Sequence, residues 1–264
     1  MGRPEKIAAI KWRMWVHIAV WCVLFTTVVL TIRKVRHFVV SDPRFTLASA
    51  DDRAQGLSME GLVYASRARV LQKFEADFGR SVFLLPLAER RRRLLAVDWV
   101  EDAAIARIWP NRISVRITER RPVAFVNVPL PGGMGSRVLL IDAQGVLLEQ
   151  PPQSRFTFPV LSGVSEEQPE PERRLRVQAM LRLLDDLGPM AKEVSEVSAT
   201  LPENLTIITQ VEGRALQLMM GNQNFSRRLQ SFLDHYPEIH RRTGNVRAFD
   251  LRLDDRITAG SQGR

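Results

Sequence analysis

Cysteine is almost absent from this chain, which has one, Cys22, among 264 residues. A single cysteine can form no intrachain disulfide, so a folded domain must either do without disulfides or reside in a reducing compartment. Cys22 also lies inside a long apolar stretch, and no cysteine outside that stretch is available as a nucleophile. The composition therefore excludes a disulfide-stapled scaffold and argues against cysteine-based catalysis.

Motifs for catalysis and for metal or phosphate binding are lacking as well. Of the four histidines, His235 and His240 are separated by Pro237 and form no helical His-Glu-x-x-His pair. No Gly-x-Ser-x-Gly elbow is present. The glycine-rich segment 129–137 lacks the Gly-Lys-Ser/Thr and the helix start of a phosphate loop. We therefore predict no catalytic residue, no metal and no cofactor.

Lysine is rare too, because it supplies only five of the 38 basic residues, and the net charge is +9. Arginine is spread over the whole chain, which can reflect the overall composition as easily as a nucleic-acid-binding surface. Charge alone therefore assigns no partner. The densest run, 89–93, has leucines on both sides, and Arg91 shares their helical face with its head group in solvent. A solvated helix face is one interpretation of this run, and contact with acidic lipid or an acidic partner is the other.

One long stretch, 14–32, has no Arg, Lys, Asp, Glu, proline or glycine and is flanked by basic residues. A bilayer core about 30 Å thick needs roughly 20 helical residues, and this stretch supplies nineteen. A cleaved signal peptide is the alternative, but its apolar region is usually about 7 to 15 residues and small residues follow it. We predict a tail over 1–13, a transmembrane helix over 14–32 and a linker over 33–56. The flanking basic residues are balanced, so charge does not fix the orientation.

Residues 57–128 predict a compact unit with the order strand, helix, helix, strand, strand. Ser66 is a candidate N-cap for the first helix, and Trp109-Pro110-Asn111 is a turn between the last two strands. The expected elements are a strand over 59–64, helices over 66–78 and 86–96, and strands over 100–108 and 112–126.

Residues 129–258 predict a β-rich unit with helices packed against it, and 259–264 a flexible tail. Asp142 and Gly145 stand at the first and fourth positions of a type I turn, which indicates a hairpin. The expected helices cover 170–187 and 225–235, and the later strands 194–198, 205–211, 215–220 and 247–257. The fold class is thus α+β, with one N-terminal transmembrane helix, a strand-helix-helix-strand-strand domain and a β domain.

The closing strand, 247–257, has the clearest period in the chain. Its apolar residues alternate with polar ones and share one face: Phe249, Leu251, Leu253 and Ile257. Such alternation is typical of a strand with one buried and one solvated face. Charges on the solvated face also protect an unpaired edge, and an edge strand is a docking site for a partner's strand. A last strand inside the sheet is the alternative.

Several short motifs recur in a fixed order along the chain. Upstream is Glu60-Gly61, and 99–125 carries Trp99-Val100, Ala103, Ile105, Arg107, Trp109-Pro110, Glu119-Arg120 and Pro122-Val123-Ala124. Downstream come Leu140-Ile141-Asp142, Gly145-Val146, Phe158-Pro159-Val160-Leu161, Gly163 and Asp250-Leu251-Arg252-Leu253-Asp254. This ordered set resembles the family of bacterial division proteins called FtsQ or DivIB. Leu253 stands where that family has an aromatic residue.

The resemblance implies a cytoplasmic tail, one membrane helix, a POTRA domain over 57–128 and a β domain over 129–258, both outside the cytoplasmic membrane. It implies a non-catalytic scaffold at the division septum that binds FtsB and FtsL and helps regulate septal peptidoglycan synthesis. FtsB would add a strand to the closing strand, with partner-binding positions Arg247, Phe249, Leu251, Arg252, Leu253, Asp254 and Arg256. Arg252 would meet an acidic side chain. A POTRA-bearing component of outer-membrane protein assembly or secretion is the alternative.

Overall fold

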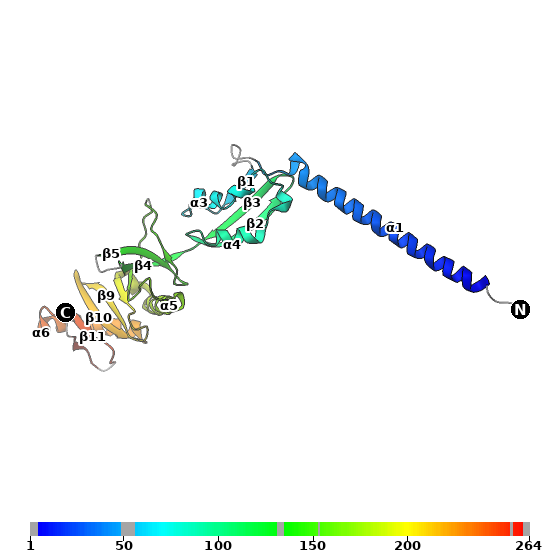
Figure 1. The fold of residues 1–264 in the computed structure, drawn as a ribbon. Coiled ribbons are helices and arrows are strands. Elements are labelled where there is room, and N and C mark those ends of the chain that lie inside the picture. The colour runs from blue at the N-terminus through cyan, green and yellow to red at the C-terminus, as the bar shows by residue number, and fades with distance from the viewer. Residues whose placement is uncertain (1–4, 49–55, 131–134, 153, 254–255, 261–264) are drawn as a thin grey trace. The chain divides into compact units, whose positions relative to one another are not determined.

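The structure is a computed structural model that describes residues 5–48, 56–130, 135–152, 154–253 and 256–260 (Figure 1). Its contacts divide the chain into two compact units, Met1–Glu119 and Arg120–Arg264. Each unit has its own sheet and is described by itself below.

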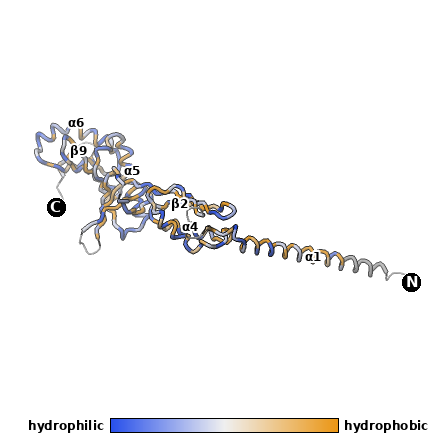
Figure 2. The backbone as a smooth tube through the Cα atoms, turned by 90° about the horizontal axis from the view of Figure 1, so that it is seen from above, coloured by the Kyte–Doolittle hydropathy of each residue, from blue (hydrophilic) through white to orange (hydrophobic). Residues whose placement is uncertain are grey.

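The first unit begins with one long helix, α1 (Glu5–Ser41). Within α1, Trp15–Ser41 is long and apolar enough to cross a membrane, and none of its most apolar window is buried; Figure 2 shows hydrophobic residues along it. The hydroxyls of Thr26, Thr27 and Thr31 donate to carbonyls four residues earlier, at 2.8 Å in each case, so these three groups would stay paired inside a bilayer. The helix extends beyond the expected 14–32, because neither proline nor glycine interrupts it before Pro43, which disfavours a helical residue 42.

The body of the first unit has the predicted order of strand, helix, helix, strand, strand. Within the described residues its sheet has the order β1-β3-β2, with β1 parallel and β2 antiparallel to β3. The regular elements are β1 (Leu57–Glu60), α3 (Arg67–Gln72), α4 (Leu87–Leu94), β2 (Val100–Ile108) and β3 (Arg112–Glu119). Three short 3-10 helices, η1 (Pro43–Phe45), η3 (Glu75–Asp77) and η4 (Val82–Leu84), complete it. The Ser66 side chain accepts from the Arg69 N–H, as the N-cap prediction requires.

The arginine run on α4 is not a uniformly solvated face. Arg90 is buried and forms a two-bond ion pair with the buried Asp77; the Nη2–Oδ1 distance is 2.7 Å. Arg91 is half exposed, donates to the Ala103 carbonyl at 2.9 Å and pairs with Asp102. The hydrogen bonds that Arg90 donates to the Asp77 carboxylate raise the pKa of Arg90. The solvated-face interpretation is therefore wrong for Arg90, because a buried carboxylate on η3 compensates its charge.

The second unit is built on one large mixed sheet. Its strand order within the described residues is β12-β11-β10-β9-β8-β7-β4-β5-β6. The strands of its first half are β4 (Pro122–Pro129), β5 (Ser136–Asp142), β6 (Leu147–Leu148) and β7 (Val160–Ser162). Those of its second half are β8 (Val194–Ser198), β9 (Leu205–Val211), β10 (Arg214–Gly221), β11 (Ala248–Asp250) and β12 (Thr258–Ala259). Two helices, α5 (Glu170–Leu187) and α6 (Phe225–Thr243), contribute Met180, Leu183, Leu187, Phe232 and Tyr236 to the same core as these strands.

The helix α6 is longer than the sequence predicts, because it continues through Pro237. A proline inside a helix removes one backbone hydrogen bond, but the turns on both sides of it stay packed through buried Tyr236 and partly buried Ile239. The helix ends at Gly244, which has a positive φ of 64°.

The single strand expected over 112–126 is wrong, since it is broken between β3 and β4. Glu119 ends β3, and its carboxylate accepts the N–H groups of Val63, Tyr64 and Ala65 at 2.7 to 2.9 Å through Oε1. Pro122 has no N–H with which to continue the β3 ladder. The following strand, β4, instead pairs with β5 and β7 in the second unit.

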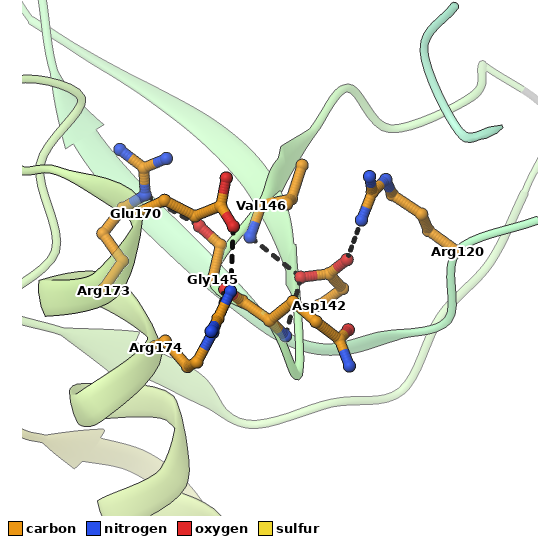
Figure 3. A network of polar contacts seen from close by, with 8 residues as sticks. Arg120, Asp142, Gly145, Val146, Glu170, Arg173 and Arg174 are labelled. Carbon is orange, nitrogen blue, oxygen red and sulfur yellow. Dashed lines mark hydrogen bonds and ion pairs between the residues drawn. The ribbon is translucent and has the colours of Figure 1, made fainter. Parts of the chain in front are cut away.

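A polar network fixes the turn between β5 and β6 (Figure 3). The buried Asp142 carboxylate accepts from the Gln144 and Val146 N–H groups at 3.0 and 2.8 Å and pairs with Arg120 at 2.9 Å. Gly145 has φ 85°, and a Cβ there would lie 2.6 Å from the Arg174 backbone nitrogen. The hairpin predicted from Asp142 and Gly145 is confirmed by these contacts, and only glycine fits the contact with α5.

Candidate partner-binding edge

The candidate site lies at one margin of the large sheet, where β11 is placed between β10 and β12. β11 runs parallel to β10, with Leu218 opposite Phe249. β12 runs antiparallel to β11, with Ala259 opposite Phe249. The strand predicted over 247–257 is therefore too long, because regular pairing with β10 ends after Asp250 and the chain returns along the outer side of β11.

Asp250 and Arg252 account for the end of β11. The Asp250 carboxylate accepts the backbone N–H of Arg252 at 3.0 Å, which forms a local turn. The Arg252 guanidinium also donates to both carboxylate oxygens, with Nη2–Oδ2 at 2.6 Å and Nε–Oδ1 at 2.9 Å. This bidentate hydrogen bonding lowers the pKa of the Asp250 carboxyl and raises that of Arg252. The positive charge of Arg252, which the sequence analysis expected to meet an acidic partner, is thus neutralised by Asp250 within the chain.

Two of the predicted partner-binding residues point into the core. Phe249 is 1% exposed, and its ring lies 5.1 Å from that of Phe232 on α6. Leu251 is buried as well, and its N–H donates to the Met219 carbonyl at 3.0 Å. These side chains hold β11 on the sheet. A partner at this edge would therefore contact the backbone of the neighbouring residues instead of these two side chains.

The other predicted residues are exposed, except that Asp254 lies outside the described residues. Arg247, Arg252 and Arg256 are all at the surface. Leu253 was expected on the buried face, but it is 53% exposed because the turn at Asp250 ends the alternation. An exposed leucine beside two arginines is suited to a partner with both apolar and acidic side chains.

A groove of about 290 Å³ adjoins this edge. The C-terminal segment lines it with Leu251, Leu253, Arg256 and Ile257, and α6 lines it with Arg227, Arg228, Ser231 and His235. Sequence reasoning missed the α6 residues, which lie on the face of the helix beside the buried Leu229, Phe232 and Tyr236. Arg228 is held in place by a 2.7 Å bond to the Met220 carbonyl. The groove combines an apolar lining with basic side chains.

Within the described residues, the outer side of β11 is covered by few backbone contacts. β12 has two residues, and the N–H of the adjacent Gly260 donates to the Ala248 carbonyl at 2.8 Å. A strand this short is easily displaced, because each backbone hydrogen bond contributes only about 0.5–1.5 kcal/mol net.

Among the residues that the structure describes, no group of three or more His, Cys, Asp or Glu residues could hold a metal ion. The His235 ring nitrogen contacts the Ser231 carbonyl at 2.7 Å, and the His240 ring stacks on Tyr236. Both histidines are explained by contacts within or beside α6.

Comparison with known proteins assigns both units. Residues 54–120 match the POTRA domain of the FtsQ type, and residues 133–252 match the C-terminal region of cell division protein FtsQ/DivIB. The cell division protein FtsQ of Koribacter versatilis is 34% identical over 81% of this chain and 60% of its own length. That of Novosphingobium aromaticivorans is 31% identical over 83% of this chain and 65% of its own length. The chain thus spans about two thirds or less of these two relatives.

An N-terminal helix long and apolar enough to cross a membrane, a POTRA domain and an FtsQ-type C-terminal domain together define the class of POTRA-bearing cell division proteins. The chain belongs to the FtsQ/DivIB family.

Proposed function

We propose that this chain is a non-catalytic scaffold of the division machinery that binds FtsB and FtsL. In this proposal α1 crosses the cytoplasmic (inner) membrane once with its N-terminus in the cytoplasm, and both domains lie outside that membrane at the division septum. Binding there would help to regulate septal peptidoglycan synthesis. The family membership supports the role in division, and the geometry of β11 supports the mode of binding. The POTRA match is of the FtsQ type, so we do not propose a role in outer-membrane assembly or secretion.

The observation that carries the proposal is the weakly covered outer side of β11. Alternate backbone groups of a strand point to its two neighbours, and the Ala248 carbonyl points away from β10 toward Gly260. A strand of FtsB would take the place of β12 and bond to these outward groups. The core-facing Phe249 and Leu251 would hold β11 rigid while the exchange occurs.

Side chains around the edge would give the strand its register and specificity. Arg252 would donate hydrogen bonds to an acidic side chain of the partner, either instead of Asp250 or in addition to it. Leu253 would contact an apolar side chain of the partner. Charge complementarity of this kind fixes orientation more than it adds affinity.

The test is binding of purified full-length protein to the FtsB–FtsL complex in detergent. Substituting Arg252→Glu and Leu253→Asp together should weaken binding about tenfold or more, equivalent to a loss of about 1.4 kcal/mol. Both side chains are exposed, so loss of the Asp250–Arg252 pair should lower the thermal unfolding midpoint only slightly. Arg214→Glu, at the first residue of β10 and also exposed, is the control and should bind normally. Unchanged affinity of the double variant would contradict the proposed site.

A second pair of variants tests the exchange of β12. Gly260→Pro removes the N–H that bonds to the Ala248 carbonyl and should loosen β12, so FtsB–FtsL should bind more tightly. Gly260→Ala keeps that N–H. Its Cβ would lie 2.9 Å from the movable end of the Met219 side chain and at an ordinary contact distance of 3.5 Å from Ala248. It should bind like the unmodified protein. Weaker binding of Gly260→Pro would mean that the partner adds to β12 instead of replacing it.

A further inference from the structure

The end of α1 is joined closely to the body of the first unit. The Ser81 hydroxyl donates to the Val39 carbonyl at 3.0 Å. A few residues on, Leu47 donates its N–H to the Arg80 carbonyl at 2.9 Å, and Gly79 donates to the Leu47 carbonyl at 3.1 Å. The segment between α1 and the domain is therefore bonded to the domain surface, and α1 continues to within a few residues of it.

Exposed apolar side chains gather at this junction. They are Phe38, Phe83, Leu84, Ile108 and Trp109, and together with the half-buried Phe45 we refer to them as the juxtamembrane face. Rings link the helix end to the sheet: Phe38 contacts Phe45 at 6.0 Å, and Phe45 contacts Trp109 at 5.8 Å between centroids. Trp109 is 53% exposed and Phe83 48%. Such a contiguous exposed apolar cluster marks a surface that has a partner.

The length of the helix places this face at the membrane surface. Trp15–Ser41 has 27 residues, which at about 1.5 Å per residue reach about 40 Å. That is the thickness of the hydrocarbon core plus both headgroup layers, about 40–45 Å. Ser41 therefore lies at the outer limit of the headgroups, with Phe38 just inside it. Tryptophan and other amphipathic aromatic residues favour this layer.

The charges around the face suit a phospholipid surface. Arg80 and Arg112 are exposed near it and form a positive rim. The nearby acids are internally compensated, because Asp42 pairs with Arg44 and Asp77 with the buried Arg90. Arg107 is also fixed, with bonds to the Val82 and Leu85 carbonyls at 2.8 and 2.6 Å that hold η4 against β2. The apolar residues on η4 are thus presented on a rigid support beside a positive rim, which attracts anionic headgroups.

We propose that the juxtamembrane face docks onto the anionic phospholipid surface of the membrane that α1 spans. The first domain then has two attachments to the bilayer, the helix and this face, and cannot swing freely about the end of α1. The opposite end of the sheet is the natural comparison. Val63 is 76% exposed there, beside Glu119 at the far end of β3, and the eight residues of β3 separate the two ends by about 25 Å.

The test uses the full-length chain in vesicles of phosphatidylethanolamine and phosphatidylglycerol. In a Cys22→Ser background, which removes the one native thiol, a fluorescent label is placed at Leu84→Cys or at Val63→Cys. Both positions are exposed within the protein. Aqueous iodide should quench the Val63 label fully and lose most of its effect on the Leu84 label, and lipids brominated near the headgroup should quench only the Leu84 label. Equal iodide quenching at the two positions would overturn the proposal.

Two further arms separate lipid contact from burial against protein. Replacing Phe83 and Trp109 by serine should restore iodide quenching of the Leu84 label, with circular dichroism confirming that the domain is folded. In vesicles of phosphatidylcholine alone, the protection should decrease, because the arginine rim loses its anionic partners. Protection of the Leu84 label that persists in detergent micelles, with no quenching by brominated lipid, would assign the face to a protein contact and contradict lipid docking.

Discussion

Two arginine–aspartate pairs of the same chemistry have opposite surroundings. Arg90 pairs with Asp77 at 2.7 Å between Nη2 and Oδ1, and both side chains are buried, at 6% and 1% exposure. Arg252 pairs with Asp250 at 2.6 Å, and its own side chain is 47% exposed. The distances are nearly equal, so what differs is the water around the charges. A partner's carboxylate can compete for Arg252, whereas nothing outside the fold can reach Arg90.

The difference shows that a short distance alone does not make an ion pair important for the stability of the fold. Breaking a buried pair leaves a charge without water or counterion, whereas an exposed pair can exchange its partners for solvent at little cost. The buried pair holds α4 against η3 in the first unit. The exposed pair ends β11 and leaves an arginine beside the proposed docking edge.

The largest effect is expected from Asp77→Asn. It removes the negative charge from the pair and leaves the buried Arg90 guanidinium uncompensated, which should lower the free energy of unfolding of the first unit by about 3–5 kcal/mol. Urea unfolding followed by a probe in that unit measures this. The matched control is Asp250→Asn, which should cost less than about 1 kcal/mol. Equal losses at the two positions would mean that burial does not distinguish the pairs.

An intermediate effect is expected from Arg120→Met, because this third pair has one buried and one largely buried member. Asp142 is 1% exposed and Arg120 20%. After the substitution Asp142 keeps the N–H donors of Gln144 and Val146, so the loss should be about 1.5–3 kcal/mol, the range for a hydrogen bond to a charged group. Urea unfolding of the second unit measures it. A loss as large as that of Asp77→Asn would show that the backbone donors do not compensate the carboxylate.

The sequence predicted those features that depend on neighbouring residues. The Ser66 cap and the Asp142–Gly145 turn are local, and both are present. The order of elements in the first unit follows from hydrophobic periods and turn residues in the same way. The family membership was predicted from the ordered motifs, several of which now have a structural role, such as Arg120 with Asp142.

The features that the sequence did not predict depend on distant partners. Apolar residues alternate with polar ones from 112 to 126, but this pattern does not indicate that Pro122 begins a strand of another sheet. The burial of Arg90 depends on Asp77, thirteen positions earlier on a different element. The turn after β11 follows from the Asp250 side chain capping the Arg252 N–H, and the groove depends on α6 packing beside it.

The smallest effect is expected from pH on the exposed pair. The hydrogen bonds from Arg252 lower the pKa of Asp250 in the folded protein below its unfolded value of about 3.9. The pair's contribution is thus fully present above about pH 5, and it is lost as the pH falls through the folded pKa. Because Arg252 is half exposed, that contribution should stay below about 1 kcal/mol.

The free energies of unfolding of the unmodified protein and of Asp250→Asn should therefore differ slightly at pH 7 and converge as the pH falls through the lowered pKa of Asp250. Salt at 1 M should reduce the difference at pH 7. Measuring urea unfolding of the second unit at each pH tests this. A difference that grows toward low pH would have the wrong sign for a lowered pKa. Salt should affect Asp77→Asn differently, because counterions cannot reach the buried Arg90. The decrease in free energy of unfolding that this substitution causes at pH 7 should therefore persist at 1 M salt.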